Sequence, residues 1–216
     1  RQSSGQLSNL VSFGGSFHAY VHLGSTGVRS RLSRAVPTTG PWVKSSTSGI
    51  PNGQTDMAFA ASSSTVFAIG GELAGAAQRS VYSSSNGTSF SLVTSTPGWE
   101  ATLSLRAVCV GSNVFVSTIN SVTDPETEET TYTQGIWGSS NGGAAWSNIT
   151  PTFSGFSGQV STIVLAALGS SLLALVSTTL NETRLYVGVG ASSQQMSSFG
   201  SVLNPNNALA SFASTP

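Results

Sequence analysis

The chain has 216 residues and a mass of 22.0 kDa, which is the size of one large domain or of a repeat array. Only 7% of its residues are charged, and eight basic residues balance eight acidic ones. This balance argues against a nucleic-acid-binding face and against a charged disordered tail. The 24 glycines and the 64 serines and threonines favour many short strands and turns.

Four similar hairpins follow one another along the chain. Each has an apolar strand, a short turn rich in glycine and serine, and a second apolar strand. The turns begin at positions 14, 63, 111 and 169, so they lie 49, 48 and 58 residues apart. A period of this length is typical of propellers and other repeat proteins. The longest interval contains residues 121–133, SVTDPETEETTYT, which we expect to form an exposed and mobile inserted hairpin or loop.

After each hairpin come a third strand, a polar turn, one aromatic residue and a short fourth strand. We expect the four aromatic residues to be buried at equivalent positions: Trp42, Phe90, Trp146 and Phe199. Four-stranded units of about 50 residues have the dimensions of propeller blades. We therefore expect residues 1–216 to form an all-β propeller, or a segment of one. The expected blades are about 8–53, 54–102, 103–159 and 160–207.

A fifth blade is expected to start at residues 208–216. Its segment ALASFAS, 208–214, has the small apolar character of the strands that open the other units. A lone strand leaves backbone N–H and C=O groups unpaired. We expect it to pair with a second chain, or with another part of a longer precursor, which would complete the propeller. Pairing with residues 2–8 is the alternative.

The turns before two of the aromatic residues carry a family signal. Residues 139–146, SSNGGAAW, resemble the Asp-box S-x-D-x-G-x-T-W with Asn141 in place of the aspartate, and residues 83–90, SSSNGTSF, fit the same frame with Ser85 in that place. The matching positions are Ser83, Ser85, Gly87 and Phe90, and Ser139, Asn141, Gly143 and Trp146. The chain thus resembles the Asp-box, or BNR, repeats of sialidase-like β-propellers. A kelch-like alternative rests on Gly70-Gly71 followed by Tyr82.

The resemblance implies a structural role for these turns, because an Asp-box is structural in the families that carry it. A sialidase would also need three arginines for the substrate carboxylate, a tyrosine nucleophile and an aspartate acid/base. Arg29 and Arg31 alternate on one expected strand and Arg34 follows in the turn, but the R-I-P motif of that family is absent. These arginines form either a solubilising face or a patch for an anionic ligand.

Other reactive residues give no catalytic, cofactor-binding or metal-binding set. Cys109 lies in the apolar run AVCV and is expected to be a buried hydrophobe. His18 and His22 share a strand face without a third ligand. The acidic residues of the insertion are expected to be a solvated loop tip, with a weak calcium site as the alternative: Asp124, Glu126, Glu128 and Glu129. The most apolar stretch, residues 163–176, is too short to span a membrane.

Three N-x-[ST] sequons begin at Asn86, Asn148 and Asn181. All three fall in an expected turn or outer strand, where a glycan would not block packing. Asn181, in the loop STTLNETRL, has the most favourable position.

These features predict a non-enzymatic extracellular or cell-surface scaffold. It would present loops to a protein or glycan partner, without a cofactor and without nucleic acid, as part of a larger assembly. The alternative is a glycan-processing enzyme resembling sialidases or other Asp-box propeller glycoside hydrolases. A pocket with three convergent arginines or two facing carboxylates would favour the enzyme.

Overall fold

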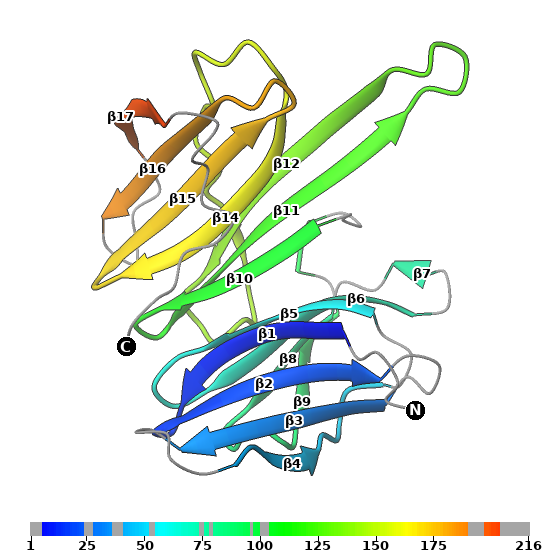
Figure 1. Ribbon diagram of the computed structural model, residues 1–216, viewed down its shortest axis with the longest axis vertical. Helices are drawn as coiled ribbons and strands as arrows, with labels where there is room; N and C mark the ends of the chain where they lie inside the picture. The colour runs from blue at the N-terminus through cyan, green and yellow to red at the C-terminus, as the bar shows by residue number, and fades with distance from the viewer. Residues whose placement is uncertain are drawn as a thin grey trace. The chain divides into compact units, whose positions relative to one another are not determined.

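The computed structural model describes residues 6–23, 28–35, 41–51, 55–73, 76–77, 80–95, 97–99, 104–189 and 197–203 (Figure 1). This part of the chain consists of strands, turns and loops, with no helix. The prediction of an all-β chain is therefore confirmed. No helix in the described ranges is long and apolar enough to cross a membrane. The expected fifth-blade strand at 208–214, and the pairing proposed for it, lie outside the described residues.

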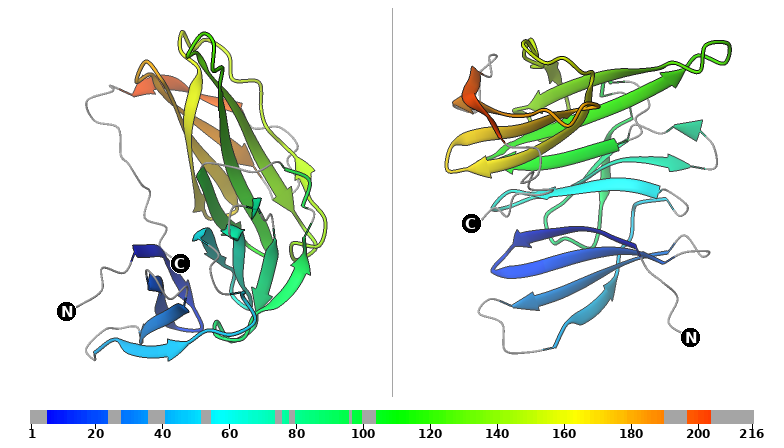
Figure 2. Two further views of the ribbon diagram at one scale, coloured as in Figure 1. Left: turned by 90° about the vertical axis from the view of Figure 1, so that its right-hand side faces the viewer. Right: turned by 45° about the horizontal axis from the view of Figure 1, so that its top comes forward.

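In the described ranges, four antiparallel sheets follow one another along the chain, and the main strands of each are hydrogen-bonded in chain order (Figures 1 and 2). The first contains β1 (Gln6–Phe13), β2 (Ser16–Leu23), β3 (Val28–Ala35) and β4 (Val43–Ser46). The second contains β5 (Thr55–Ala61), β6 (Val66–Leu73), β8 (Val81–Ser84) and β9 (Ser91–Thr94), with β7 (Ala76–Ala77) paired to β6. The third contains β10 (Ser104–Val110), β11 (Asn113–Thr123), β12 (Thr130–Ser139) and β13 (Ser147–Asn148). The fourth contains β14 (Val160–Leu168), β15 (Ser171–Thr178), β16 (Thr183–Val189) and β17 (Ser197–Leu203).

The hairpin turns expected from the sequence lie between the first two strands of each sheet. Gly14, Gly111 and Gly169 occupy the left-handed region, with φ of 56°, 61° and 59°. Glycine adopts this conformation without the steric cost that a side chain adds. In the second sheet the turn instead uses Ser62, whose Oγ accepts hydrogen bonds from the backbone N–H groups of Ser64 and Thr65.

The chain divides into two compact units. The first comprises Arg1–Pro97 and Asn141–Ala145, and the second comprises Gly98–Ser140 and Trp146–Pro216. The first unit thus holds the first two sheets, and the second holds the other two.

Aromatic packing joins the two sheets of the first unit. The rings of Tyr20 on β2 and Phe59 on β5 stack with their centroids 4.0 Å apart and their planes 2° apart. Phe90 meets both rings edge-on, at 6.1 and 6.3 Å. All three side chains are at most 5% exposed, so this cluster is the centre of the core of the unit.

Apolar side chains of β11, β12, β14 and β15 form the core of the second unit, including Phe115, Ile136, Ile163 and Val176. Residues 113–119 of β11 are all buried, as expected for a strand covered on both faces. A buried hydrogen bond of 3.0 Å from Ser117 Oγ to the carbonyl oxygen of Ile163 links the two sheets.

Candidate functional site

The turn at residues 83–90, here called the Asn86 turn, is held by two polar side chains. Asn86 Oδ1 accepts hydrogen bonds from the backbone N–H groups of Thr88 and Ser89, at 2.9 and 2.8 Å. Ser84 Oγ accepts from the N–H of Gly87 at 2.9 Å and donates to Asn86 Oδ1 at 3.0 Å. A short acceptor that satisfies the N–H groups two and three residues ahead is the mechanism of an Asx turn.

The prediction that Ser85 replaces the Asp-box aspartate is wrong. The acceptors are its two neighbours, Ser84 and Asn86, and Ser85 is exposed. The N–H groups of Thr88 and Ser89 lie two and three residues after Asn86, which places Asn86, and not Ser85, at the acceptor position of the turn. Ser83 is half-buried and Gly87 is buried, with a φ of 71°.

The first sheet contacts the Asn86 turn through two polar side chains. Tyr20 donates to the carbonyl oxygen of Gly87 at 3.0 Å, and Arg31 Nη1 donates to the carbonyl oxygen of Asn86 at 2.9 Å. Arg31 Nε also donates to Ser45 Oγ at 3.1 Å. The turn is therefore an attachment point between sheets, in agreement with a structural role.

The three arginines of the expected patch differ in their positions and contacts. Arg31 is committed to the two contacts just described. Arg34 lies inside β3 and pairs with Phe17, whereas the sequence placed it in the following turn; β3 continues to Ala35. Arg29 pairs with His22, and its side chain, like that of Arg34, is outside the described part.

In the turn at residues 139–146, Asn141 Oδ1 accepts from the backbone N–H of Ala145 at 2.9 Å. Ser139 and Gly143 are buried, and Gly143 has a φ of 86°. A Cβ on Gly143 would lie 3.0 Å from Val81 Cγ1, so the backbone of this turn packs closely on β8. Trp146 packs edge-on against Trp99, with centroids 4.9 Å apart.

The expected burial of the four aromatic residues holds only in part. Phe90 is 5% exposed, and Trp146 is half-buried. Trp42 is 43% exposed, so the prediction is wrong there: it precedes β4, a short strand that is itself largely exposed. The side chain of Phe199 is not among those described.

The insertion at 121–133 is an extension of a hairpin. Residues of β10 pair with β11 as far as Ile119, and β11 and β12 then continue as a two-stranded ribbon from Asn120↔Thr133 to Thr123↔Thr130. We call residues 120–133 the arm (Figures 1 and 2). The tip, residues 124–129, is exposed throughout, as is Val122 at 64%. The expected exposure of the insertion is confirmed for residues 122–129, whereas Tyr132 is half-buried and packs against the core of the second unit.

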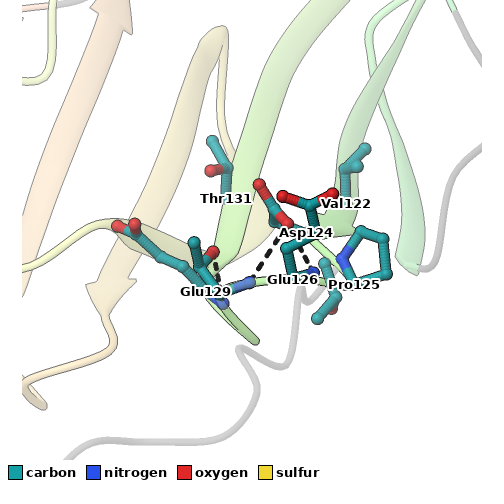
Figure 3. A pocket seen from close by; sticks show the side chains of 8 residues that line it. Val122, Asp124, Pro125, Glu126, Glu129 and Thr131 are labelled. Carbon is teal, nitrogen blue, oxygen red and sulfur yellow. Dashed lines mark hydrogen bonds between the residues drawn. The ribbon is translucent and has the colours of Figure 1, made fainter.

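The tip of the arm is held by its own hydrogen bonds (Figure 3). Asp124 accepts at Oδ1 from the backbone N–H groups of Glu126 and Thr127, at 2.8 and 3.2 Å. These bonds favour the charged form and hold the pKa of the Asp124 carboxyl below its ordinary value. Glu128 adopts a φ of 59°, which closes the turn. Within the described ranges, no three His, Cys, Asp or Glu side chains are grouped so that they could hold a metal ion.

Sequence reasoning missed three side chains of the second unit that bind backbone. Gln159 accepts from the N–H of Tyr132 at 3.0 Å and donates to the carbonyl oxygen of Thr130, beside the tip of the arm, at 3.5 Å. Glu182 accepts from the N–H groups of Ser157 and Gly158, and Arg184 donates to the carbonyl oxygen of Ser154. These hydrogen bonds join residues that are 24–30 positions apart in the sequence, so no local sequence pattern predicts them.

The remaining candidates are residues of the interior or surface. His18 is 5% exposed, and desolvation lowers the pKa of its imidazole. Burial raises the pKa of the Cys109 thiol to about 12, which leaves the thiol unreactive at neutral pH. The three sequon asparagines, Asn86, Asn148 and Asn181, are all exposed.

No family model and no curated protein matches this chain. Among solved structures, that of YjhT is similar to it, with a TM-score of 0.58 at 12% sequence identity. The likeness covers 88% of this chain and 68% of the YjhT chain. At this identity it concerns the fold alone, and it agrees with the β-rich architecture.

Proposed function

We propose that this chain is a β-propeller segment with degenerate Asp-box turns that serves as a non-enzymatic scaffold outside the cell or on its surface. It presents loops to a protein or glycan partner within a larger assembly. The four successive sheets, three of four strands and one of five, and the side-chain acceptors in the 83–90 and 139–146 turns support this interpretation.

The observation that carries the scaffold proposal is the arm. Its ribbon continues beyond the last pairing with β10, and its exposed tip carries four acidic residues and no basic one. Gln159 hydrogen-bonds the backbone of β12 within the arm, at Tyr132 and at Thr130 beside the tip. A hairpin whose strands are paired up to an exposed, hydrogen-bonded tip offers a surface to a partner, and such preorganisation lowers the entropic cost of binding.

The alternative, a glycan-processing enzyme resembling sialidases, needs arginines that are available to a substrate carboxylate. Arg31 donates instead to Asn86 and Ser45. One of the three arginines that lie close together in the sequence, Arg29, Arg31 and Arg34, is thus engaged in holding the fold. This favours the scaffold.

Site-specific photo-crosslinking tests the proposal. A photoreactive amino acid is placed at Thr127 in the arm tip of the chain as it is expressed in the cells that produce it. The matched control is the same group at Leu168, which is 68% exposed at the β14–β15 turn. We expect a discrete protein or glycoprotein adduct from Thr127 that is absent from Leu168.

A shortened arm provides the second measurement. Residues 122–131 are replaced by Asn-Gly, so that a two-residue turn joins the pair Ser121↔Tyr132. Binding of the cross-linked partner should fall at least tenfold while the thermal midpoint stays unchanged. Equal adducts from both positions, or turnover of fluorogenic sialosides and other glycosides above background, would refute the scaffold proposal.

A further inference from the structure

Two of the three sequons share one local conformation. In the first, Thr88 donates to Asn86 Oδ1 both from its backbone N–H, at 2.9 Å, and from Oγ1, at 3.0 Å. In the second, Thr150 donates in the same way to Asn148 Oδ1, at 2.9 and 2.5 Å. In both sequons the threonine hydroxyl therefore donates a hydrogen bond to the side-chain oxygen of the sequon asparagine.

We propose that Asn86 and Asn148 carry N-linked oligosaccharides. The proposal rests on the proposed function in one respect, since it requires that the chain pass through a secretory pathway. It goes further by naming two attachment atoms and the chemical class of the modification.

The geometry leaves the attachment atoms available. Every hydrogen bond described for the two side chains uses Oδ1, and none is described for either Nδ2 in the resolved ranges. In the transfer, Nδ2 forms a bond to the anomeric carbon of a lipid-pyrophosphate-linked oligosaccharide. The bond from that carbon to the pyrophosphate oxygen breaks, the lipid pyrophosphate leaves, and the amide nitrogen gives up one proton to a base. Oδ1 is retained, so the folded turn tolerates the product.

The surroundings of both asparagines have room for a bulky substituent. Asn86 and its neighbour Ser85 are exposed in the turn before β9. Asn148 is exposed in β13 beside the exposed Ser147, and β13 lies at the end of the strand order of its sheet. Bulky polar glycans on such outer positions would also add solubility to a surface with few charges.

The third sequon provides an internal contrast. Asn181 is exposed, but Thr183 is 1% exposed and its hydroxyl contacts Ser177 Oγ at 2.9 Å. The folded hairpin thus separates this hydroxyl from its asparagine, and the proposal is confined to the first two sites.

Expression of the full 216-residue chain behind a secretion signal in a eukaryotic host tests the proposal. The secreted protein is analysed by intact mass and by peptide mass spectrometry, before and after treatment with peptide-N-glycosidase. We expect glycan mass at Asn86 and Asn148, and conversion of both to aspartate by the enzyme.

Two conservative pairs of variants separate modification from folding. Asn86→Asp and Asn148→Asp keep the acceptor oxygen but remove the amide, so each should lose one glycan without loss of secretion. Thr88→Ser and Thr150→Ser keep the hydroxyl and should retain the modification. A secreted chain without glycan at either position overturns this inference and leaves the arm experiments untouched, since they do not depend on glycosylation. A glycan at one position only would overturn the assignment of the other.

Discussion

The hydroxyl of Tyr20 donates to the carbonyl oxygen of Gly87, 67 residues further along the chain. The same tyrosine ring stacks on Phe59, so one side chain links the strand of the first sheet to both the core and the Asn86 turn. A buried carbonyl needs a donor, and here a side chain of the neighbouring sheet provides it.

Replacement Tyr20→Phe keeps the stacked ring and removes only the hydroxyl. The carbonyl oxygen of Gly87 then lacks its described partner, so we expect a loss of about 1–2 kcal/mol in the free energy of unfolding. Urea denaturation measures this loss. Tyr132→Phe is the matched control, expected to change stability by less than about 0.5 kcal/mol because no hydrogen bond of that hydroxyl is described in the resolved ranges. Equal effects of the two variants would contradict the assigned role of Tyr20.

The stability should also fall at alkaline pH through Tyr20. Burial raises the pKa of this phenol well above its ordinary value of about 10. The unfolded chain releases the proton near pH 10 while the folded chain retains it, so the contribution is full below pH 10 and is lost as the pH rises further. The wild type should therefore lose stability as the pH rises from about 10 to about 12, by more than Tyr20→Phe does. Parallel pH profiles of the two proteins would rule out this linkage.

Much of the fold could be predicted because its signals are local. Alternating or continuous apolar runs mark the strands, and glycines with positive φ at Gly14, Gly111 and Gly169 mark three hairpin turns. The same local reasoning located the arm as an exposed insertion.

The identity of the acceptor in the Asn86 turn could not be predicted from composition. Ser84, Ser85 and Asn86 all carry a short polar side chain, and the conformation of the folded turn decides which of them reaches the N–H groups. The contacts of Gln159, Glu182 and Arg184 join segments distant in sequence, so they depend on tertiary packing that a single sequence does not specify.

The close approach of Gly49 to the Asn86 turn predicts a severe effect of one methyl group. Ser48 exchanges backbone hydrogen bonds with Thr88 and Phe90, and a Cβ on Gly49 would lie 1.7 Å from the carbonyl oxygen of Phe90. Gly49→Ala should therefore cost about 3 kcal/mol or more, the upper range for overpacking. Gly111→Ala is the control: its φ is also positive, but nothing lies within 4 Å, so backbone strain of about 1 kcal/mol is expected. Similar thermal midpoints for the two variants would contradict the contact.

Substitutions of Asn86 test the acceptor oxygen in the unmodified chain. Asn86→Ala removes the partner of two backbone N–H groups and should destabilise the protein by about 1–2 kcal/mol. Asn86→Asp keeps an oxygen in place and should stay within about 0.5 kcal/mol of the wild type. Bacterially produced protein is compared by urea denaturation, so that glycans play no part. If Ser85→Ala lowers the free energy of unfolding as much as Asn86→Ala, Ser85 occupies the aspartate position of the Asp-box and the assignment of Asn86 as the acceptor is wrong.

Glu182 should make the second unit sensitive to acid. Its Oε2 accepts hydrogen bonds from the backbone N–H groups of Gly158 and Ser157 and one from Thr178 Oγ1, and these bonds hold the pKa of the carboxyl below its ordinary value. The unfolded chain binds the proton near pH 4, so the stabilisation is present above that pH and is lost as the pH falls through the folded pKa.

At pH 7 Glu182→Gln should lower the urea midpoint and speed hydrogen exchange at the amides of Ser157 and Gly158. At pH 2 to 3 the two proteins should converge, because the carboxyl of the wild type is then protonated as well. Glu129→Gln, at the exposed tip of the arm, is the control and should follow the wild type throughout. A difference between wild type and Glu182→Gln that persists unchanged at low pH would show that lost packing, rather than the charged acceptor, anchors residues 157–158.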